Sequence, residues 1–527
     1  MASIYEVSIS GLERILHSNS YRSARVAFAT ALVVGLLCHL YGFVNLFPSH
    51  DYLDALYYNE SEYIHKISLG RLCAPLYTLS TASQATMPWS AGFFGVVFLS
   101  FAAAMIANEF KLAPISSIAL SAVVVSNRTV TATVATYMHD FGAYSFAFLT
   151  ATISFVLWIA ATRREKINMA ALAGGSICLS IAMAIYQATL SIPLVLIVLY
   201  SIWRLVVRRD NVSVVFSSGL WAAGMVLMSG LLYFLLYKLV LFAFKINPAD
   251  AYNSLSAASR NGEGLLDRIV GCYREVISIL FGSKVASAYP VVFVKGANAL
   301  LFVLTVLGLL RSTVGATPLD KKAAILTCAL LIVLPLFANI SRALTVETHD
   351  LMYFGVWLMV LLPLVLFFKN KSEACFADKG IAVIFLLLVS SNFQTANLSY
   401  QVKDMRYEGT QSLMTEIMYR VDALPEYSEG VTPVVFLGEI GNTLRDSPEA
   451  WRINKITGMD KWPISPNYTD IPFVGYVLGR NVNVRHSSSG EWTNLVGDRG
   501  SFPASDSIWM EDGVAYVNLG VQAKNSV

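Results

Sequence analysis

The sequence predicts an all-α polytopic membrane protein with about eleven transmembrane helices, followed by a small C-terminal α/β domain outside the membrane. Hydrophobic residues make up 55% of the 527 residues and charged residues only 14%, whereas a soluble domain carries about a quarter charged residues. The hydrophobic residues gather in runs long enough to cross about 30 Å of hydrocarbon. After residue 396 the apolar runs become shorter and polar residues separate them, which is typical of a water-soluble domain.

The apolar runs place the predicted spans. In order along the chain they lie near residues 26–44, 88–107, 112–126, 141–161, 168–185, 189–207, 213–236, 290–310, 323–340, 351–368 and 380–396. The third run is short and is followed by Asn127 and Arg128. No signal peptide is expected, because the first apolar run is a full span and no small-residue cleavage site follows it. We therefore predict a membrane domain over 1–396 and a C-terminal domain over 397–527.

The basic residues of the short loops predict the orientation of the chain. When the loops are numbered alternately from the N-terminus, one set carries sixteen basic residues, and the other carries only Lys66, Arg71, Arg128 and Arg342. Basic residues are enriched in cytoplasmic loops, so the N-terminus is expected in the cytoplasm. Eleven spans then put everything after Asn397 outside.

Several outer segments have helical or strand patterns of their own. In the long loop 238–289, apolar residues recur at helical spacing from Leu265 to Leu280, which predicts an amphipathic helix lying on the outer membrane surface. The segment 51–67 has a similar pattern. In the tail, an apolar helical stripe covers 411–424, and 432–437 and 513–519 are typical of buried strands.

Composition and motifs exclude several functions. The net charge of +3 is small and no basic run could follow a phosphate backbone, so no nucleic-acid partner is expected. The six cysteines contain no CxxC pair and no regular spacing, which argues against a disulfide framework and a zinc site. The patterns GxxxxGK[ST], HExxH and GxSxG are absent, which argues against nucleotide hydrolysis, zinc proteolysis and a hydrolase elbow.

Polar residues able to take part in chemistry gather on the predicted outer side. A carboxylate there can take the proton from an attacking hydroxyl, and cations can hold the phosphate of a lipid donor as it leaves. The acidic and imidazole side chains are Asp51, Asp54, Asp140, His50, His139 and His349, the cations are Lys66, Arg71, Lys295 and Arg342, and a short outer loop adds Tyr186 and Gln187.

These residues also have structural explanations. Asp51 and Asp54 could satisfy free amides at the N-terminus of a surface helix. Arg71 could anchor a span at the membrane interface, and Lys295, about one turn inside the eighth span, could extend its ammonium group to the surface. The pair at 186–187 could simply end a helix.

Three short segments carry a resemblance to a known family. They are the run 45–54 (NLFPSHDYLD) after the first span, the run 68–71 (SLGR) with Pro75 and Leu76, and the run 184–188 (AIYQA) at the outer end of the fifth span. With the order of the spans over about the first 400 residues, these segments resemble the Gtr-type O-antigen glucosyltransferases, the serotype-converting enzymes of bacteria and phages. The resemblance does not extend to the tail.

The resemblance implies a GT-C-like membrane fold and a glycosyltransferase activity. The expected donor is a sugar, most simply glucose, on undecaprenyl phosphate, and the expected acceptor is an O-antigen or a related surface polysaccharide. The reaction would take place at the outer face of the bacterial cytoplasmic (inner) membrane, with the C-terminal domain in the periplasm. No cofactor is required. A divalent metal is compatible with this chemistry, but His139 beside Asp140 is too little to support one.

The resemblance also implies roles for the outer residues. In GT-C enzymes an acidic residue of the first outer loop acts near the acceptor hydroxyl, and Asp51 matches that position best. Asp54 and Asp140 are further catalytic candidates, and which carboxylate is the base stays open. Contacts to the donor phosphate are expected from Arg71, Lys66, Lys295, Arg342 and His349, and contacts to the substrates from His50, His139, Tyr186 and Gln187.

Two other classes of function fit part of the sequence. A polysaccharide polymerase or ligase would use the same lipid carrier on the same side of the membrane, and the sequence does not separate it from a glycosyltransferase. A lipid-linked sugar flippase would place its polar residues near the membrane midplane on broken helices. The carboxylates here lie at one face instead, which disfavours the flippase.

The orientation can be tested with fusions. A reporter that is active only outside the cytoplasm should be active when fused after Asn397 and silent when fused at Arg164, because the basic loops hold Arg164 in the cytoplasm. The measurement is reporter activity at equal fusion abundance. The reverse pattern would contradict the predicted topology.

Overall fold

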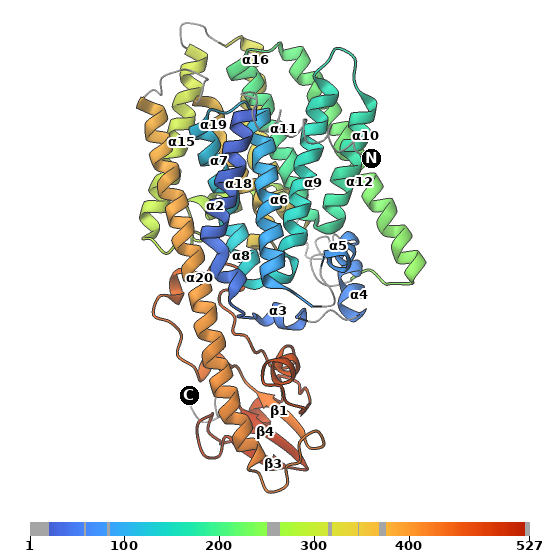
Figure 1. Ribbon diagram of the computed structural model, residues 1–527, viewed down its shortest axis with the longest axis vertical. Helices are drawn as coiled ribbons and strands as arrows, with labels where there is room; N and C mark the ends of the chain where they lie inside the picture. Colours follow the sequence, from blue (N-terminus) through green and yellow to red (C-terminus); the bar gives the residue numbers. More distant parts are fainter. Residues whose placement is uncertain are drawn as a thin grey trace, which may run out of the picture.

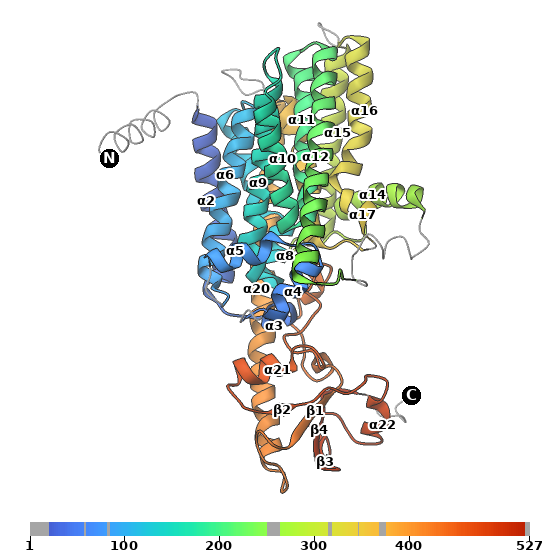
Figure 2. The ribbon, with the colours of Figure 1, turned by 90° about the vertical axis from the view of Figure 1, so that its right-hand side faces the viewer.

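The computed structural model shows a bundle of long helices with a smaller α/β unit at one end (Figures 1 and 2). It describes residues 21–56, 60–81, 85–249, 264–314, 319–345, 347–367 and 376–521. The long helices run side by side, and the C-terminal unit is attached through α20 (Phe376–Asp422), which extends out of the bundle (Figure 1).

Nine helices in the described part of the chain are long and apolar enough to cross a membrane. They are α2 (Arg22–Val44), α6 (Pro88–Glu109), α7 (Pro114–Ser126) continued by α8 (Arg128–Thr136), α9 (Met138–Thr162), η2 (Gln187–Leu190) continued by α11 (Ser191–Trp203) and η3 (Arg204–Arg208), α12 (Val212–Phe244), α15 (Val291–Val314), α16 (Lys321–Ala338) and α20. Shorter apolar helices occupy the two remaining predicted spans, α10 (Met169–Ile185) and the pair α18 (Phe354–Met359) and α19 (Leu362–Phe367). The prediction of a polytopic all-α membrane protein is confirmed.

The chain stays inside the bundle after the third predicted span. Asn127 has an extended backbone and ends α7, and its side-chain oxygen then accepts hydrogen bonds from the amides of Thr129 and Val130. This is the arrangement of a helix N-cap, so α8 starts at Arg128. All of α8 is buried, and Arg128 is only 6% exposed. The expectation that Arg128 lies in an outer loop is therefore wrong, because its polar neighbour marks a break between two buried helices.

Small residues allow the first spans to pack closely. Ala27, Ala31 and Gly35 of α2 are all buried. A Cβ atom at Gly35 would lie 2.7 Å from Cγ1 of Val96 in α6, which leaves no room for a larger side chain. Close approach through small residues is the usual way in which membrane helices associate. Packing of this kind holds the loops that join these helices in defined places.

The C-terminal unit is built on the projecting half of α20. A helix of 47 residues is roughly 70 Å long, which is about twice the thickness of the hydrocarbon core of a bilayer. The predicted stripe at 411–424 lies on this half, and its Met414 and Ile417 are buried against Val434 and Phe436 of the sheet. The passage from the spans to the C-terminal unit therefore takes place inside one continuous helix.

The sheet of the C-terminal unit has four short strands in the order β2-β1-β4-β3. β1 (Pro433–Leu437) pairs in parallel with β2 (Asn483–Val484) and with β4 (Val514–Asn518), and β3 (Ile508–Glu511) pairs antiparallel with β4. Both strands that the sequence predicts are present. The short helices α21 (Asp470–Pro472) and α22 (Trp492–Val496) lie in the connections between the strands.

Short helices gather at the end of the bundle that carries the C-terminal unit (Figures 1 and 2). They are α3 (His50–Asp54), α4 (Glu60–Ser68), α5 (Cys73–Thr81) and α17 (Ile340–Leu344), followed by η4 (Asp350–Met352). The segment 51–67 therefore belongs to two helices, α3 and α4, and not to one. Leu53 of α3 is fully buried in the core of the C-terminal unit. The predicted amphipathic helix is confirmed as α14 (Leu265–Leu280), which crosses the direction of the long helices (Figure 2).

Buried charges fix the C-terminal unit to the bundle. Lys403 of α20 is 1% exposed and donates a hydrogen bond to the carbonyl of Gly458 at 2.5 Å. Asp350 accepts a hydrogen bond from the amide of Thr457 at 2.7 Å and pairs with Arg128 of α8 at 2.7 Å. Breaking such a buried pair by removing one partner is strongly destabilising, so these contacts hold the segment 454–461 firmly against the bundle.

Candidate functional site

The first turn of α9 places a carboxylate inside a group of cations and aromatic side chains, which we call the Asp140 cluster: Lys66, Arg71, His139, Asp140 and Tyr144. Asp140 is 1% exposed. Its Oδ1 lies 2.5 Å from Nζ of Lys66. Its Oδ2 accepts a hydrogen bond from the hydroxyl of Tyr144 at 3.0 Å and lies 3.4 Å from Nε2 of His139 and 4.0 Å from Nη1 of Arg71. The structure therefore brings together residues from α4, α9 and the turn before α5.

Lys66 and Arg71, the two cations of the Asp140 cluster, differ in their exposure and in their hydrogen-bond partners. Lys66 is 2% exposed, is paired with Asp140, and lies 3.8 Å from Glu62 one turn earlier in α4. Arg71 is 24% exposed. Its Nη1 donates a hydrogen bond to the hydroxyl of Tyr144 at 2.9 Å, and none of the described residues is seen to accept a hydrogen bond from its Nε or Nη2. Within the described part of the chain, these two nitrogen atoms make Arg71 the candidate ligand for an anion.

Two stacked tyrosines support the guanidinium of Arg71. The rings of Tyr144 and Tyr186 are parallel to within 9°, and their centres are 4.2 Å apart. The Cζ atom of Arg71 lies 5.2 Å from the centre of the Tyr186 ring and 5.9 Å from that of Tyr144. A cation held over an aromatic face keeps its charge while losing little of its donor capacity. Tyr186, predicted as a substrate contact, thus orients Arg71.

Three side chains donate hydrogen bonds to carbonyl groups of the turn that carries Arg71. Gln187 donates to the carbonyl of Leu69 at 2.8 Å, Tyr233 donates to that of Gly70 at 3.2 Å, and Tyr237 donates to that of Ser68 at 2.9 Å. Both tyrosines belong to α12, and Gln187 opens η2. Gln187, which the sequence predicted as a substrate contact, thus holds the backbone of the turn in place.

Asp51 lies in a separate and more open position at the same end of the bundle. Its carboxylate is 21% exposed, Oδ2 lies 3.2 Å from Nε2 of His50, and Oδ1 accepts a hydrogen bond from the hydroxyl of Tyr468 at 3.0 Å. Burial lowers the pKa of His50 to about 4, although the charge of Asp51 acts in the opposite direction. The imidazole is therefore neutral near pH 7, and among the described residues no Lys or Arg forms an ion pair with Asp51.

A stacked pair of rings connects Asp51 with the Asp140 cluster. Tyr52, the residue after Asp51, stacks on His139 with 6.1 Å between the ring centres. His139 in turn contacts Asp140. Two carboxylates of different character therefore lie on either side of one aromatic pair, the accessible Asp51 and the buried Asp140.

Other predicted cations lie elsewhere. Arg342 of α17 is 3.9 Å from Glu275 of α14, and Lys284 pairs with the same carboxylate. Although burial alone would raise the pKa of Glu275, hydrogen bonds from Lys284 and Tyr353 keep it below its ordinary value. Burial lowers the pKa of His349. These residues form a second group on the other side of η2, which contacts both α17 and η4.

Two predicted residues are not brought into either group. Lys295 is half-buried on α15, and in the described part of the chain no ion pair with it is seen. The side chain of Asp54 lies outside the described residues, although the backbone of α3 includes this position. The roles predicted for both residues stay predictions.

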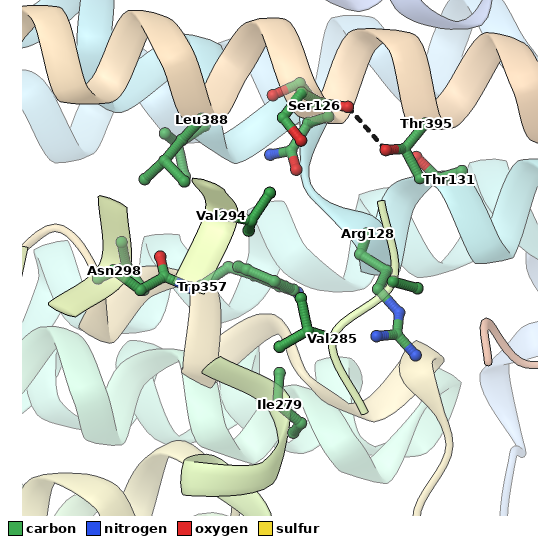
Figure 3. A pocket seen from close by; sticks show the side chains of 15 residues that line it. Ser126, Arg128, Thr131, Ile279, Val285, Val294, Asn298, Trp357, Leu388 and Thr395 are labelled. Atoms are coloured by element: carbon green, nitrogen blue, oxygen red, sulfur yellow. Dashed lines mark hydrogen bonds between the residues drawn. The ribbon is translucent and has the colours of Figure 1, made fainter. Parts of the chain in front are cut away.

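A pocket beside α8 is lined by Arg128, whose charge is paired inside the protein, unlike that of Arg71. It lies between α7, α8, α14, α15, α18 and α20, with Arg128 and Asn298 on opposite sides and Trp357 between them (Figure 3). Nη2 of Arg128 donates to Asp350 at 2.9 Å and to the carbonyl of Lys455 at 2.6 Å, Nη1 donates to the carbonyl of Lys284, and Nε faces Asp350. Both Nη atoms donate hydrogen bonds inside the protein, and the guanidinium is buried in an ion pair with Asp350, so Arg128 has a structural role.

Sequence reasoning missed Tyr468, Lys403 and the pairing of Arg128 with Asp350. Tyr468 lies in a polar stretch with no periodic pattern, so no local signal connects it with Asp51. Lys403 could have been noticed as a lysine on the buried face of a helix. Groups of three or more His, Cys, Asp or Glu side chains that could hold a metal ion are not found among the described residues.

Comparison with known proteins gives one family. A family model described as "Glucosyl transferase GtrII" matches residues 40–367. The matched range contains Asp51, the whole Asp140 cluster and the second group around Glu275, and it ends before α20. No match to the chain was found among the curated proteins or among the solved structures.

The turn before Arg71 should be intolerant of any side chain at Gly70. The backbone there has φ +84°, and a Cβ atom would meet the hydroxyl of Tyr233 and lie 2.7 Å from Nε2 of Gln187. Gly70→Ala should therefore destabilise the protein by about 1–3 kcal/mol, measured as a lower Tm in detergent.

Gly219→Ala is the matched control, because a Cβ atom at this position in α12 meets nothing within 4 Å. It should melt with the wild type or slightly above it, since alanine is the better helix former. Equal Tm values for Gly70→Ala and the wild type would contradict the description of this turn.

Proposed function

The chain belongs to the GtrII glucosyl transferase family, and from that premise we propose that it transfers glucose from a polyprenyl-phosphate carrier to an O-antigen or related surface polysaccharide. The reaction takes place at the outer face of the bacterial cytoplasmic membrane. The observation that carries the proposal is the pair of accessible groups at one end of the bundle, the carboxylate of Asp51 and the guanidinium of Arg71.

Arg71 holds the phosphate of the donor. Its position between the end of α4 and the start of α5 puts it at the end of the spans, where the phosphate of a membrane-embedded lipid lies. Its planar fork can bind two phosphate oxygens at once, which a lysine cannot do. The charge of Lys66 is paired with Asp140. In this proposal Lys66 holds the carboxylate of Asp140 in place and does not contact the donor.

Asp51 acts as the general base. It takes the proton from the acceptor hydroxyl while the hydroxyl oxygen forms a bond to the anomeric carbon and the bond from that carbon to the phosphate oxygen breaks. The leaving phosphate carries the negative charge, and Arg71 neutralises part of it. This single displacement balances without a metal or a cofactor.

Asp140 is a positioning residue in this scheme. A carboxylate with 1% exposure and an ammonium group at 2.5 Å is held ionised and has no access to an acceptor hydroxyl. Its oxygens instead fix Lys66, Tyr144 and His139. We therefore assign the base to Asp51 and the organisation of the phosphate site to Asp140.

Arg342 and His349 are secondary donor contacts in the proposal. Both lie at the same end of the bundle as Arg71, across η2, and the charge of Asp51 acts on His349. A polymerase or ligase reaction would use the same residues. Analysis of the product distinguishes it, because a polymerase lengthens the polysaccharide whereas a glucosyl transferase adds side groups of a single sugar.

Removing the base should stop the reaction with little effect on folding. Asp51→Asn should lower transfer by about 10²–10⁴-fold, because the acceptor proton then has no acceptor group. The measurement is mass spectrometry of surface polysaccharide from cells that carry each variant, together with the amount of protein in the membrane.

Glu416→Gln is the control, because Glu416 is an exposed carboxylate on the projecting part of α20. It should keep wild-type activity. If Asp51→Asn retains more than about a tenth of the activity, the general base lies elsewhere.

Arg71→Lys should separate charge from geometry at the phosphate site. Lysine keeps the positive charge but lacks the planar guanidinium that binds two phosphate oxygens. We therefore expect kcat/KM for the donor lipid to fall by about tenfold or more. The measurement is transfer against donor-lipid concentration in detergent. Arg163→Lys, at an exposed position, is the control and should be unaffected. A wild-type curve for Arg71→Lys would move the phosphate site away from Arg71.

A further inference from the structure

The C-terminal unit reaches into the neighbourhood of the proposed base. The hydroxyl of Tyr468 donates a hydrogen bond to Oδ1 of Asp51 at 3.0 Å, across 417 residues of sequence. Tyr468 lies outside the range that the family model matches, whereas Asp51 lies inside it. The contact therefore joins two parts of the chain that the family comparison separates.

The loop that carries Tyr468 is well ordered by its own hydrogen bonds. Thr469 is fully buried, donates to the carbonyl of Pro463 at 3.0 Å and accepts from the amide of Ser465 at 2.8 Å. Asp470 is also buried and accepts from the amide of Asn467 at 3.1 Å. Tyr468 itself is 44% exposed. The backbone of this loop is therefore fixed, and the exposed side chain of Tyr468 points toward Asp51.

The other side of the contact is equally fixed. Ser49, the N-cap residue of α3, donates a hydrogen bond to the carbonyl of Thr136 at the end of α8 at 2.8 Å. The hydroxyl of Thr136 donates in turn to the carbonyl of Thr457 in the C-terminal unit at 3.2 Å. Helix α3 is therefore held between the bundle and the C-terminal unit, with Asp51 facing Tyr468.

We propose that Tyr468 is a positioning residue for Asp51, so that the C-terminal unit completes the catalytic site. The inference rests on the proposed function, because it assigns Asp51 as the base. The hydroxyl of Tyr468 fixes one carboxylate oxygen, and the second oxygen, next to His50, receives the proton of the acceptor hydroxyl. A chain that lost the C-terminal unit would keep the base but not its orientation.

The hydrogen bond should be visible in kcat and not in donor binding. The orientation of the base acts on the transfer of the acceptor proton, which belongs to the chemical step. Donor binding depends on Arg71, which Tyr468 does not contact in the described part of the chain. Loss of the Tyr468 hydroxyl therefore lowers kcat and leaves KM for the donor nearly unchanged.

The experiment compares Tyr468→Phe with the wild type over a range of donor concentrations, with polyprenyl-phosphate-glucose as donor in detergent and the rate given per amount of folded enzyme. We expect kcat to fall by roughly tenfold, with little change in KM for the donor. Tyr419→Phe is the matched control, since Tyr419 of α20 is 76% exposed, and it should leave kcat and KM unchanged.

The rate is given per folded enzyme, so the test stays informative if the yield of Tyr468→Phe falls. A wild-type kcat for Tyr468→Phe, or a raised KM for the donor with kcat unchanged, would overturn the inference. The proposed function is tested separately by Asp51→Asn. An inactive Asp51→Asn with a wild-type kcat for Tyr468→Phe would remove only the role of Tyr468, whereas an active Asp51→Asn would remove both.

Discussion

The burial of one carboxylate organises the end of the bundle that carries the C-terminal unit. Asp140 lies at the start of α9 with almost no exposure, where an ionised group is costly unless other groups pair with it. Lys66 and Arg71 supply the charge, and Tyr144 supplies a hydrogen bond. Lys66 and Arg71 come from the segment between the first two spans. Their pairing with Asp140 therefore holds α4 and the turn before α5 against α9. The position of the phosphate-binding arginine in the proposal follows from this requirement.

Two arginine–carboxylate pairs at this end of the protein show how the surroundings decide the role of a residue. Both Nη atoms of Arg128 donate hydrogen bonds, to Asp350 and to two backbone carbonyls, and its charge is paired with Asp350, so the side chain joins α8, η4 and the C-terminal unit. Among the described residues, Arg71 donates a hydrogen bond through one nitrogen only and lies beside two stacked tyrosines, which makes the rest of its guanidinium the candidate ligand site. The same two residue types give a structural bond in one place and a candidate binding site in the other.

The long helix α20 gives the C-terminal unit its place beside the site. It continues without a break from the bundle into the core of the sheet, where Met414 and Ile417 pack. Lys403 on the same helix ties the segment 454–461 to the bundle. As a result the loop that carries Tyr468 is held over α3, and the site proposed here contains residues from both halves of the chain.

The sequence by itself determined the spans, the amphipathic helix α14, two strands of the sheet and the polar end of the bundle, because these depend on local hydrophobic periodicity and on charge in short loops. It also selected Lys66, Arg71 and Asp140 as members of an outer polar group. Only the tertiary structure decided which of them meet, that Arg128 is buried in α8, that Gln187 holds a backbone turn, and that Tyr468 faces Asp51. These outcomes depend on contacts between residues far apart in the chain, and hydropathy and charge carry no information about such pairings.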